Sequence, residues 1–366
     1  MNPLPESVFF TPKNLSLRIN LPFFNERKMK YLFLFLLLAP LCLRLSAQTE
    51  PAKKPTIFEK LTAAEGMELT LEADLTTFIA QKRTNAYMSG KLTTKEGKIY
   101  TVEIRPRGRY RRKVSQNPPM KIRFSEKELA AEGLDTLNEI KIAVPAFDSD
   151  LGNELIVKEY LAYRMFTKVS DAHFRTGLVK LTLRDNNEKT PGKKVMSAIF
   201  IEDEEEVAAR LGSAPEEGYG IPMEQYDTQQ AAHVAMFQYL IGNTDWDFSM
   251  HRNVQLFKMK KDGKIMVVPY DFDFSGFVAA PYASPNSDSG LKSVRDRYLM
   301  STDLNADALK AAVKLLKTKE KELYQVCRSK FLPKSVANEA SKFLEIYFQK
   351  MAGKDEAPKT MPFDKE

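Results

Sequence analysis

Oxygen-bearing side chains that suit phosphoryl transfer concentrate in one stretch of the chain. Asp245 and Asp247 lie in an acidic loop, Asn253 follows them, and Asp271 and Asp273 come after an apolar segment. Carboxylate and amide oxygens are the ligands that Mg²⁺ and Mn²⁺ prefer. Phosphoryl transfer depends mainly on such ions and on positioning, because the transferred group carries concentrated negative charge. We therefore expect Asp245 or Asp247 to accept or orient the proton of an attacking hydroxyl, and Asn253, Asp271 and Asp273 to bind the metal.

The elements around this stretch are expected to bring these side chains together. An apolar helix is predicted over Thr228–Ile241, and Gly242-Asn243 is a good stop signal for it. Strands are predicted over Val254–Met259 and Ile265–Pro269, joined by a turn that contains Asp262-Gly263, a strong hairpin signal. Such a hairpin folds Asn253 back beside Asp271.

Each of these residues also has a purely structural interpretation. Asp245 and Asp247 can cap a turn, and Asp271 can simply face water at the end of an apolar run. Protein kinases share the order of catalytic Asp, Asn, hairpin and metal-binding Asp. Their usual spacing from Asp to Asn is five residues, whereas Asn253 lies six residues after Asp247 and eight after Asp245. The match is therefore to the order of the parts.

The earlier part of the chain has the alternating pattern of β-strands, and the later part has mainly helical periodicity. Strands are predicted over residues 67–73, 86–92, 99–104, 120–124, 140–144, 176–183 and 195–201. Helices are predicted from residue 153 onward and over residues 203–211, 309–316, 320–331 and 334–351. This asymmetry predicts an α+β protein with a β-rich N-terminal lobe and a helical C-terminal lobe.

The expected organisation has five parts. It comprises a leader over 1–47, a linker over 48–64, the β-rich lobe over 65–201, the helical lobe with the catalytic hairpin over 202–352, and a flexible tail over 353–366.

The leader has the three-part pattern of a secretory signal. Basic residues surround Met29, the expected start, and are followed by the apolar run Tyr31–Leu43 and by small residues up to Ala47. The run is too short to span a membrane as a helix. We expect an exported protein, in the periplasm, on the cell surface or outside the cell, with no transmembrane segment in the mature chain. An uncleaved anchor and a lipoprotein attached at Cys42 are alternatives.

The charge balance gives little reason to expect a nucleic-acid partner. The net charge is +7, but residues 1–47 contribute six basic and two acidic residues, which leaves +3 for the rest. Nucleic-acid binding needs a basic patch. The turn Arg105–Lys113 is strongly basic, and it is interpreted either as a phosphate contact or as an ordinary basic surface.

These motifs together resemble the CotH kinase family, the atypical secreted kinases related to spore-coat protein H. The resemblance spans about Arg105 to Phe277. Its four parts are Arg105-x-Arg107-Gly108 with Pro119-Met120-Lys121-Ile122, the Glu154-to-Met165 helix, Gly242-Asn243-Thr244-Asp245 with Asn253, and Val268-Pro269-Tyr270-Asp271-Phe272-Asp273.

The resemblance implies a two-lobed atypical protein-kinase-like fold that uses ATP with Mg²⁺ or Mn²⁺ to phosphorylate Ser or Thr of a protein. Lys121 and Arg107 would contact the ATP phosphates, Glu154 or Glu159 would hold Lys121, and Glu202 would lie near the base.

Two positions depart from the family pattern. Arg109-Tyr110-Arg111 stands where a Ser is expected after Arg-Gly, and Tyr270 replaces a Trp. A non-catalytic envelope or surface binding protein on the same scaffold, and a metal-dependent phosphohydrolase, remain alternatives.

Overall fold

The computed structural model describes residues 53–108, 110–189, 191–300, 303–354 and 356–358. The predicted leader 1–47, the start of the predicted linker and the end of the predicted tail lie outside these residues. The elements below all belong to one compact unit, residues 54–366. Among the described helices, none combines the length and the apolar character needed to cross a membrane.

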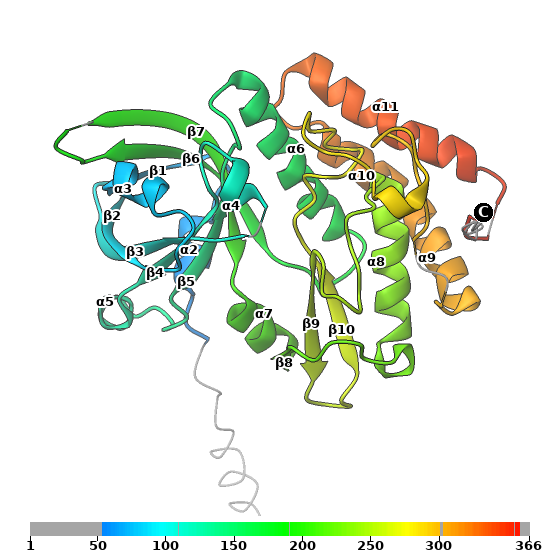
Figure 1. Ribbon diagram of the computed structural model, residues 1–366. Helices are drawn as coiled ribbons and strands as arrows, with labels where there is room; N and C mark the ends of the chain where they lie inside the picture. Colours follow the sequence, from blue (N-terminus) through cyan, green and yellow to red (C-terminus); the bar gives the residue numbers. More distant parts are fainter. Residues whose placement is uncertain (1–52, 109, 190, 301–302, 355, 359–366) are drawn as a thin grey trace, which may run out of the picture. The chain divides into compact units, whose positions relative to one another are not determined.

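A closed seven-stranded barrel forms the first part of this unit (Figure 1). Its strands are β1 (Met67–Ala73), β2 (Met88–Thr94), β3 (Ile99–Pro106), β4 (Met120–Phe124), β5 (Glu139–Ala143), β6 (Thr176–Asp185) and β7 (Gly192–Glu202), in the order β1-β2-β3-β4-β5-β7-β6. All neighbours are antiparallel except β1 and β6, where Leu71 lies opposite Leu183 in a parallel pair that closes the barrel. Side chains alternate between the core and the surface, as Tyr100, Val102 and Ile104 of β3 show.

Short helices cover the barrel at places where sequence analysis predicts none. They are α2 (Ile57–Leu61), α3 (Leu75–Ala80), α4 (Arg111–Val114) and α5 (Glu126–Ala131). Helix α2 lies inside the segment predicted as a linker, and its Ile57, Phe58 and Leu61 are buried in the barrel core. A capping box between Thr56 and Glu59 stabilises its first turn. The described end of that segment is therefore folded.

Helix α6 (Asp150–Phe166) begins after the N-cap Ser149, three residues before the predicted start. Its buried side chains do not join the barrel core. They pack in a second hydrophobic cluster together with Leu178 of β6, Ile199 of β7 and the helices that follow. The hydrophobic core therefore divides within the predicted N-terminal lobe, ahead of residue 201.

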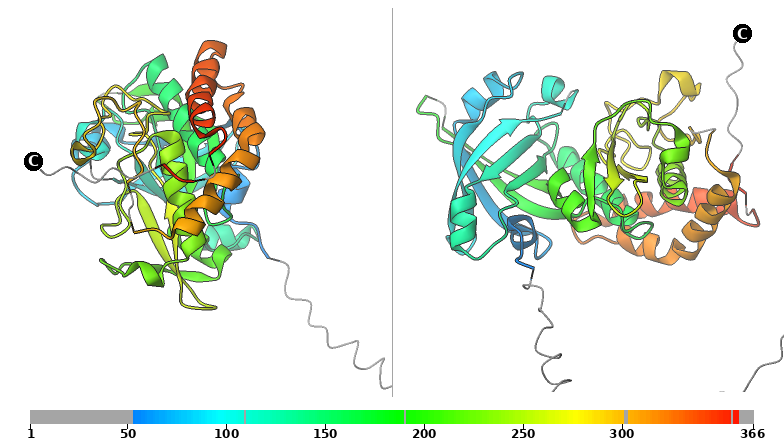
Figure 2. Two further views of the ribbon diagram at one scale, coloured as in Figure 1. Left: turned by 90° about the vertical axis from the view of Figure 1, so that its right-hand side faces the viewer. Right: turned by 90° about the horizontal axis from the view of Figure 1, so that it is seen from below.

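The remaining elements are mainly helical and surround one small sheet. They are α7 (Glu204–Leu211), β8 (Ser213–Glu216), η1 (Met223–Gln225), α8 (Thr228–Ile241), β9 (Val254–Met259), β10 (Ile265–Pro269), η2 (Ser287–Ser289), α9 (Ala306–Thr318), α10 (Glu320–Cys327) and α11 (Lys334–Met351). The sheet has the order β10-β9-β8, and the hairpin β9–β10 lies alongside the buried helix α8 (Figure 2). Helix α8 ends at Gly242, whose φ of +63° favours glycine.

The mixed α+β composition and most strand positions agree with the sequence analysis. Closure of the barrel was not predicted. The division into two kinase-like lobes stays a prediction.

Candidate functional site

The acidic loop after α8 is held by hydrogen bonds among its own residues. Asn243 is fully buried; its Oδ1 accepts from the Asp245 amide at 2.9 Å, and its carbonyl accepts from Trp246 Nε1 at 3.1 Å. Asn253 Nδ2 donates to Asp245 Oδ2 at 2.9 Å and to the Asp245 carbonyl at 2.7 Å. Asp245 and Asn253 are therefore fixed side by side.

The hairpin β9–β10 returns the chain to this pair. Val254 lies opposite Pro269, and the amide of Tyr270 donates to the Asn253 carbonyl at 3.0 Å, so Asp271 follows directly beside the loop. Asn253 and Asp271 have φ values of +51° and +60°. Such backbone conformations cost about 1–3 kcal/mol each and gather at functional sites.

A buried arginine joins Asp271 to helix α6. Arg111 of α4 is only 7% exposed; its Nη1 lies 3.2 Å from Glu159 Oε2 and 3.5 Å from Asp271 Oδ1. Its Nη2 donates to the Val144 carbonyl at 2.8 Å, and its Nε lies 3.7 Å from Asp273 Oδ2. Glu159 and Asp273 are almost fully buried, whereas Asp271 is 39% exposed. Asp271 is thus the carboxylate of this group that solvent and ligands can reach.

Negative charge at this place exceeds the positive charge beside it. Burial, opposed by the Arg111 charge, raises the pKa of Glu159 to about 7. Burial and then the Asp271 charge raise the pKa of Asp273 well above its usual value, and the same two causes raise the pKa of Asp245. An added cation would relieve the repulsion among these carboxylates, which the charges of Arg111, Arg107 and Arg252 offset only in part.

The donor set fits a divalent cation chemically. Asp271 offers carboxylate oxygens, and Asn253 keeps its amide Oδ1 while its Nδ2 is occupied by Asp245. Among the described residues, no three His, Cys, Asp or Glu side chains are arranged to hold a metal. A cation here would therefore need the Asn253 oxygen in addition to carboxylates. Asp273 is less suited than predicted, because its Oδ2 accepts from Tyr282 at 3.1 Å and its side chain is buried.

Asp247 lies apart from this group, although it is only two residues from Asp245. Its Oδ1 accepts from Ser249 Oγ and from the Met250 amide, both at 2.7 Å, within a turn. It lines a cavity of about 240 Å³ together with Trp246 and Tyr226. The structure therefore favours Asp245 over Asp247 for contact with Asn253 and Asp271.

The expected phosphate-binding lysine has other partners. Lys121 forms ion pairs with Glu139 and, at 2.9 Å, with Asp203. The structure does not bring it to Glu159, which pairs with Arg111. In the described part of the chain, no hydrogen bond or ion pair reaches the carboxylate of Glu154. Arg107 is partly buried, and its amide donates to the Pro119 carbonyl at 2.8 Å.

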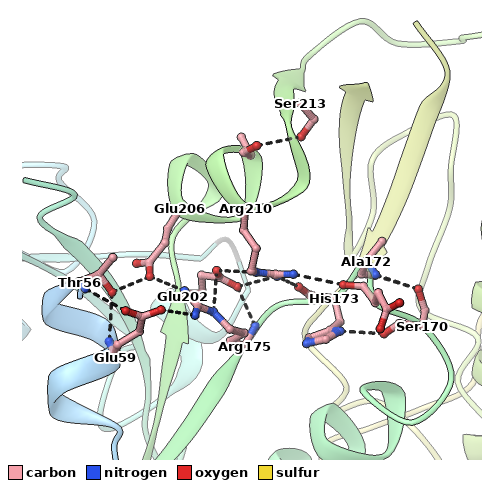
Figure 3. A network of polar contacts seen from close by, with 12 residues as sticks. Thr56, Glu59, Ser170, Ala172, His173, Arg175, Glu202, Glu206, Arg210 and Ser213 are labelled. Carbon is pink, nitrogen blue, oxygen red and sulfur yellow. Dashed lines mark hydrogen bonds and ion pairs between the residues drawn. The ribbon is translucent and has the colours of Figure 1, made fainter. Parts of the chain in front are cut away.

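Glu202 belongs to a partly buried ionic network (Figure 3). Its carboxylate accepts from Arg175 Nε at 2.9 Å and from Arg210 Nη2 at 2.9 Å, and it is fully buried. Arg175 also contacts Glu59 at 2.6 Å and Glu206 at 2.5 Å. The Glu202 side chain is therefore already engaged, and its backbone amide donates to the Arg175 carbonyl at 3.0 Å.

Three members of the site were not predicted from the sequence. Arg111 lies within the basic turn that was interpreted as phosphate contact or surface, and nothing in that run distinguishes it from its neighbours. The hydroxyl of Tyr163 accepts from the Asp271 amide at 2.8 Å, and Tyr282 donates to Asp273. The sequence pattern included only Tyr163, as part of the apolar face of the predicted helix, and this position indicated core packing.

Comparisons with known proteins add little to this geometry. No protein-family model matches the chain, and no curated protein matches it in sequence. Among solved structures, it is similar to the crystal structure of a Helicobacter pylori proinflammatory kinase, CtkA. The similarity covers 73% of this chain and 89% of that chain, with a TM-score of 0.36 and 9% sequence identity. A similarity at this level carries no argument about chemistry, which therefore rests on the residues described above.

Proposed function

We propose that this chain is an exported, metal-dependent kinase that transfers the γ-phosphoryl group of ATP to Ser or Thr hydroxyls of a protein. We also propose that it is a distant member of the CotH kinase family with a two-lobed fold, on the motifs that span Arg105 to Phe277. The observation that carries the proposed activity is the hairpin β9–β10. It brings Asp271 beside the Asp245–Asn253 pair, with both Asn253 and Asp271 in left-handed backbone conformations.

Each residue has a role in this proposal. Asp271 and the Oδ1 of Asn253 would hold the Mg²⁺ or Mn²⁺, which neutralises charge on the phosphates when bound. Asp245 orients the acceptor hydroxyl and takes its proton as the oxygen bonds to the γ-phosphorus and ADP leaves. The raised pKa of Asp245 suits a group that must hold a proton for part of the cycle.

Arg111 takes the place that we expected for Lys121. Its guanidinium pairs with Glu159 of α6 and reaches Asp271. Because Arg111 is only 7% exposed, it positions the helix and the Asp271 carboxylate. The cavity lined by Trp246 and Asp247, in the same loop as Asp245, would take part of an acceptor segment.

Metal-dependent nucleotide binding tests this proposal directly. With ATP and Mg²⁺ or Mn²⁺ at about 100 times Kd, linkage gives about 2.7 kcal/mol of stabilisation. Because the folded unit spans residues 54–366, we expect a rise in Tm of about 4 °C. Asp271→Asn removes one charge while asparagine tolerates the positive φ, so this variant should fold and lose the rise. Asp262→Asn in the exposed β9–β10 turn is the matched control. An unchanged rise in Asp271→Asn would contradict the metal assignment.

Transfer of labelled γ-phosphate separates the kinase from its alternatives. We expect label on protein with wild type and at least a hundredfold less with Asp245→Asn. Phosphate release without label on protein would favour a phosphohydrolase. Absence of any thermal shift at millimolar nucleotide would favour a non-catalytic binding protein.

A further inference from the structure

A second cavity lies at one end of the barrel, built by residues outside the proposed phosphotransfer site. Its volume is about 350 Å³, within the range of small-molecule sites. It is lined by the start of β4, the end of β6, the start of β7 and helix α3. Barrel mouths are a common place for ligand sites, because the strands that splay there leave space that side chains do not fill.

The wall of this cavity is mainly apolar. Phe78 and Leu75 of α3, Met120 of β4 and Leu183 of β6 line it, and all four belong to the buried core of the barrel. Ile79 lines it from a partly exposed position. The four core side chains are at most 8% exposed, so Ile79 offers more of the apolar surface that a ligand could cover, at a gain of about 25 cal/mol per Å². The occupant should therefore have an apolar body.

Among the lining residues, two lysines, Lys193 and Lys194, outnumber the one carboxylate, Asp185. Asp185 is already used, because its carboxylate accepts from the Leu75 amide at 2.9 Å and from Thr76 Oγ1 at 2.7 Å. Lys194 pairs with Asp148 at 2.7 Å. Lys193 is exposed, lines the cavity, and has no ion pair within the part of the chain that the structure describes. An anionic head group would complement this lysine.

We propose that the barrel mouth binds a single-chain amphiphile with an apolar tail and a carboxylate head, with the tail against Ile79 and Leu75 and the head at Lys193. This site is independent of the proposed kinase chemistry, because none of its lining residues contributes to the group around Asp271.

Binding of three probes with the same ten-carbon tail tests the proposal. We expect decanoate to bind the whole protein about two- to fivefold more tightly than decanol, as an exposed ion pair would give, and decyltrimethylammonium to bind most weakly. Isothermal titration calorimetry measures all three, and octanoate should bind more weakly than decanoate because a shorter tail buries less apolar surface.

Two substitutions with matched controls separate tail from head. Ile79→Trp should fill the cavity and abolish binding of all three probes, whereas Ile99→Trp, at an exposed position on β3, should leave binding unchanged. Lys193→Glu should reverse the preference between decanoate and decyltrimethylammonium and leave decanol unaffected, whereas Lys91→Glu on the exposed face of β2 should do neither. A melting temperature for each variant establishes that it is folded.

Three results would overturn the proposal. They are equal affinity for all three head groups, equal loss in Ile79→Trp and Ile99→Trp, and binding to phosphatidylglycerol vesicles without binding of free decanoate.

Discussion

Removing the buried guanidinium of Arg111 should destabilise the fold strongly, and the loss should depend on Glu159. In Arg111→Met, Glu159 and Asp273 keep their burial, at 2% and 4% exposure, but lose their cationic partner. Breaking a buried ion pair from one side costs about 3–5 kcal/mol. Because the pKa of Glu159 is already raised to about 7, proton uptake would offset part of this cost near neutral pH, and we expect a loss of about 3 kcal/mol.

The double variant measures the coupling energy between Arg111 and Glu159. In Arg111→Met/Glu159→Gln, neither member of the pair is charged, so the loss should be smaller than the sum of the two single losses by about 1–3 kcal/mol. Urea unfolding at pH 7.5, followed by the fluorescence of Trp246, the single tryptophan of the chain, measures all three variants. Lys113→Met, on the exposed side of the same helix, should change stability by less than about 0.5 kcal/mol. A loss below about 1 kcal/mol in Arg111→Met, or strict additivity, would refute the account.

Three further substitutions test other parts of the fold. The pKa of Glu206 is raised to about 7, mainly by burial, so the stability linked to its protonation is present below about pH 4.5 and is lost as pH rises through 7. Glu206→Gln should therefore flatten the pH dependence of the unfolding free energy by up to about 3 kcal/mol over that window, and an unchanged profile would contradict the shift. Gly152→Ala should lower the unfolding free energy by about 1–3 kcal/mol despite the better helix propensity of alanine, because the added Cβ would lie 2.3 Å from the Phe147 carbonyl oxygen. Urea unfolding measures this loss, and an unchanged unfolding free energy would contradict the predicted steric clash. Ala279→Gly should stabilise by about 0.5–1 kcal/mol, since Ala279 has a φ of +54°, and a lower Tm would contradict the strain.

The bounds of helices and strands are predicted best where buried residues recur at a regular, short spacing along the chain. The predicted bounds of β4, α8, β9, β10 and α11 agree with the structure, because local alternation or helical spacing follows the burial of those elements. The prediction that a hairpin returns Asn253 toward Asp271 depended only on these local patterns, and the structure has that hairpin.

Pairings between distant segments have no such signal. The parallel contact of β1 with β6 joins residues more than 100 positions apart, and neither strand carries a pattern that specifies its neighbour. The same limit applies to Arg111, because a run of basic residues indicates a solvated surface, and only the short helix α4 turns one of them inward. Lys121 alternates correctly along β4, but its partners Glu139 and Asp203 come from other elements.

Closure of the barrel has a consequence for how the protein can be made in pieces. Strand β1 gains its second neighbour only from β6, and β5 gains its own only from β7. A fragment that stops before Thr176 would leave rows of unsatisfied amide and carbonyl groups on both β1 and β5, where other chains can pair and aggregate. Any truncation intended to isolate the barrel should therefore extend at least to Glu202.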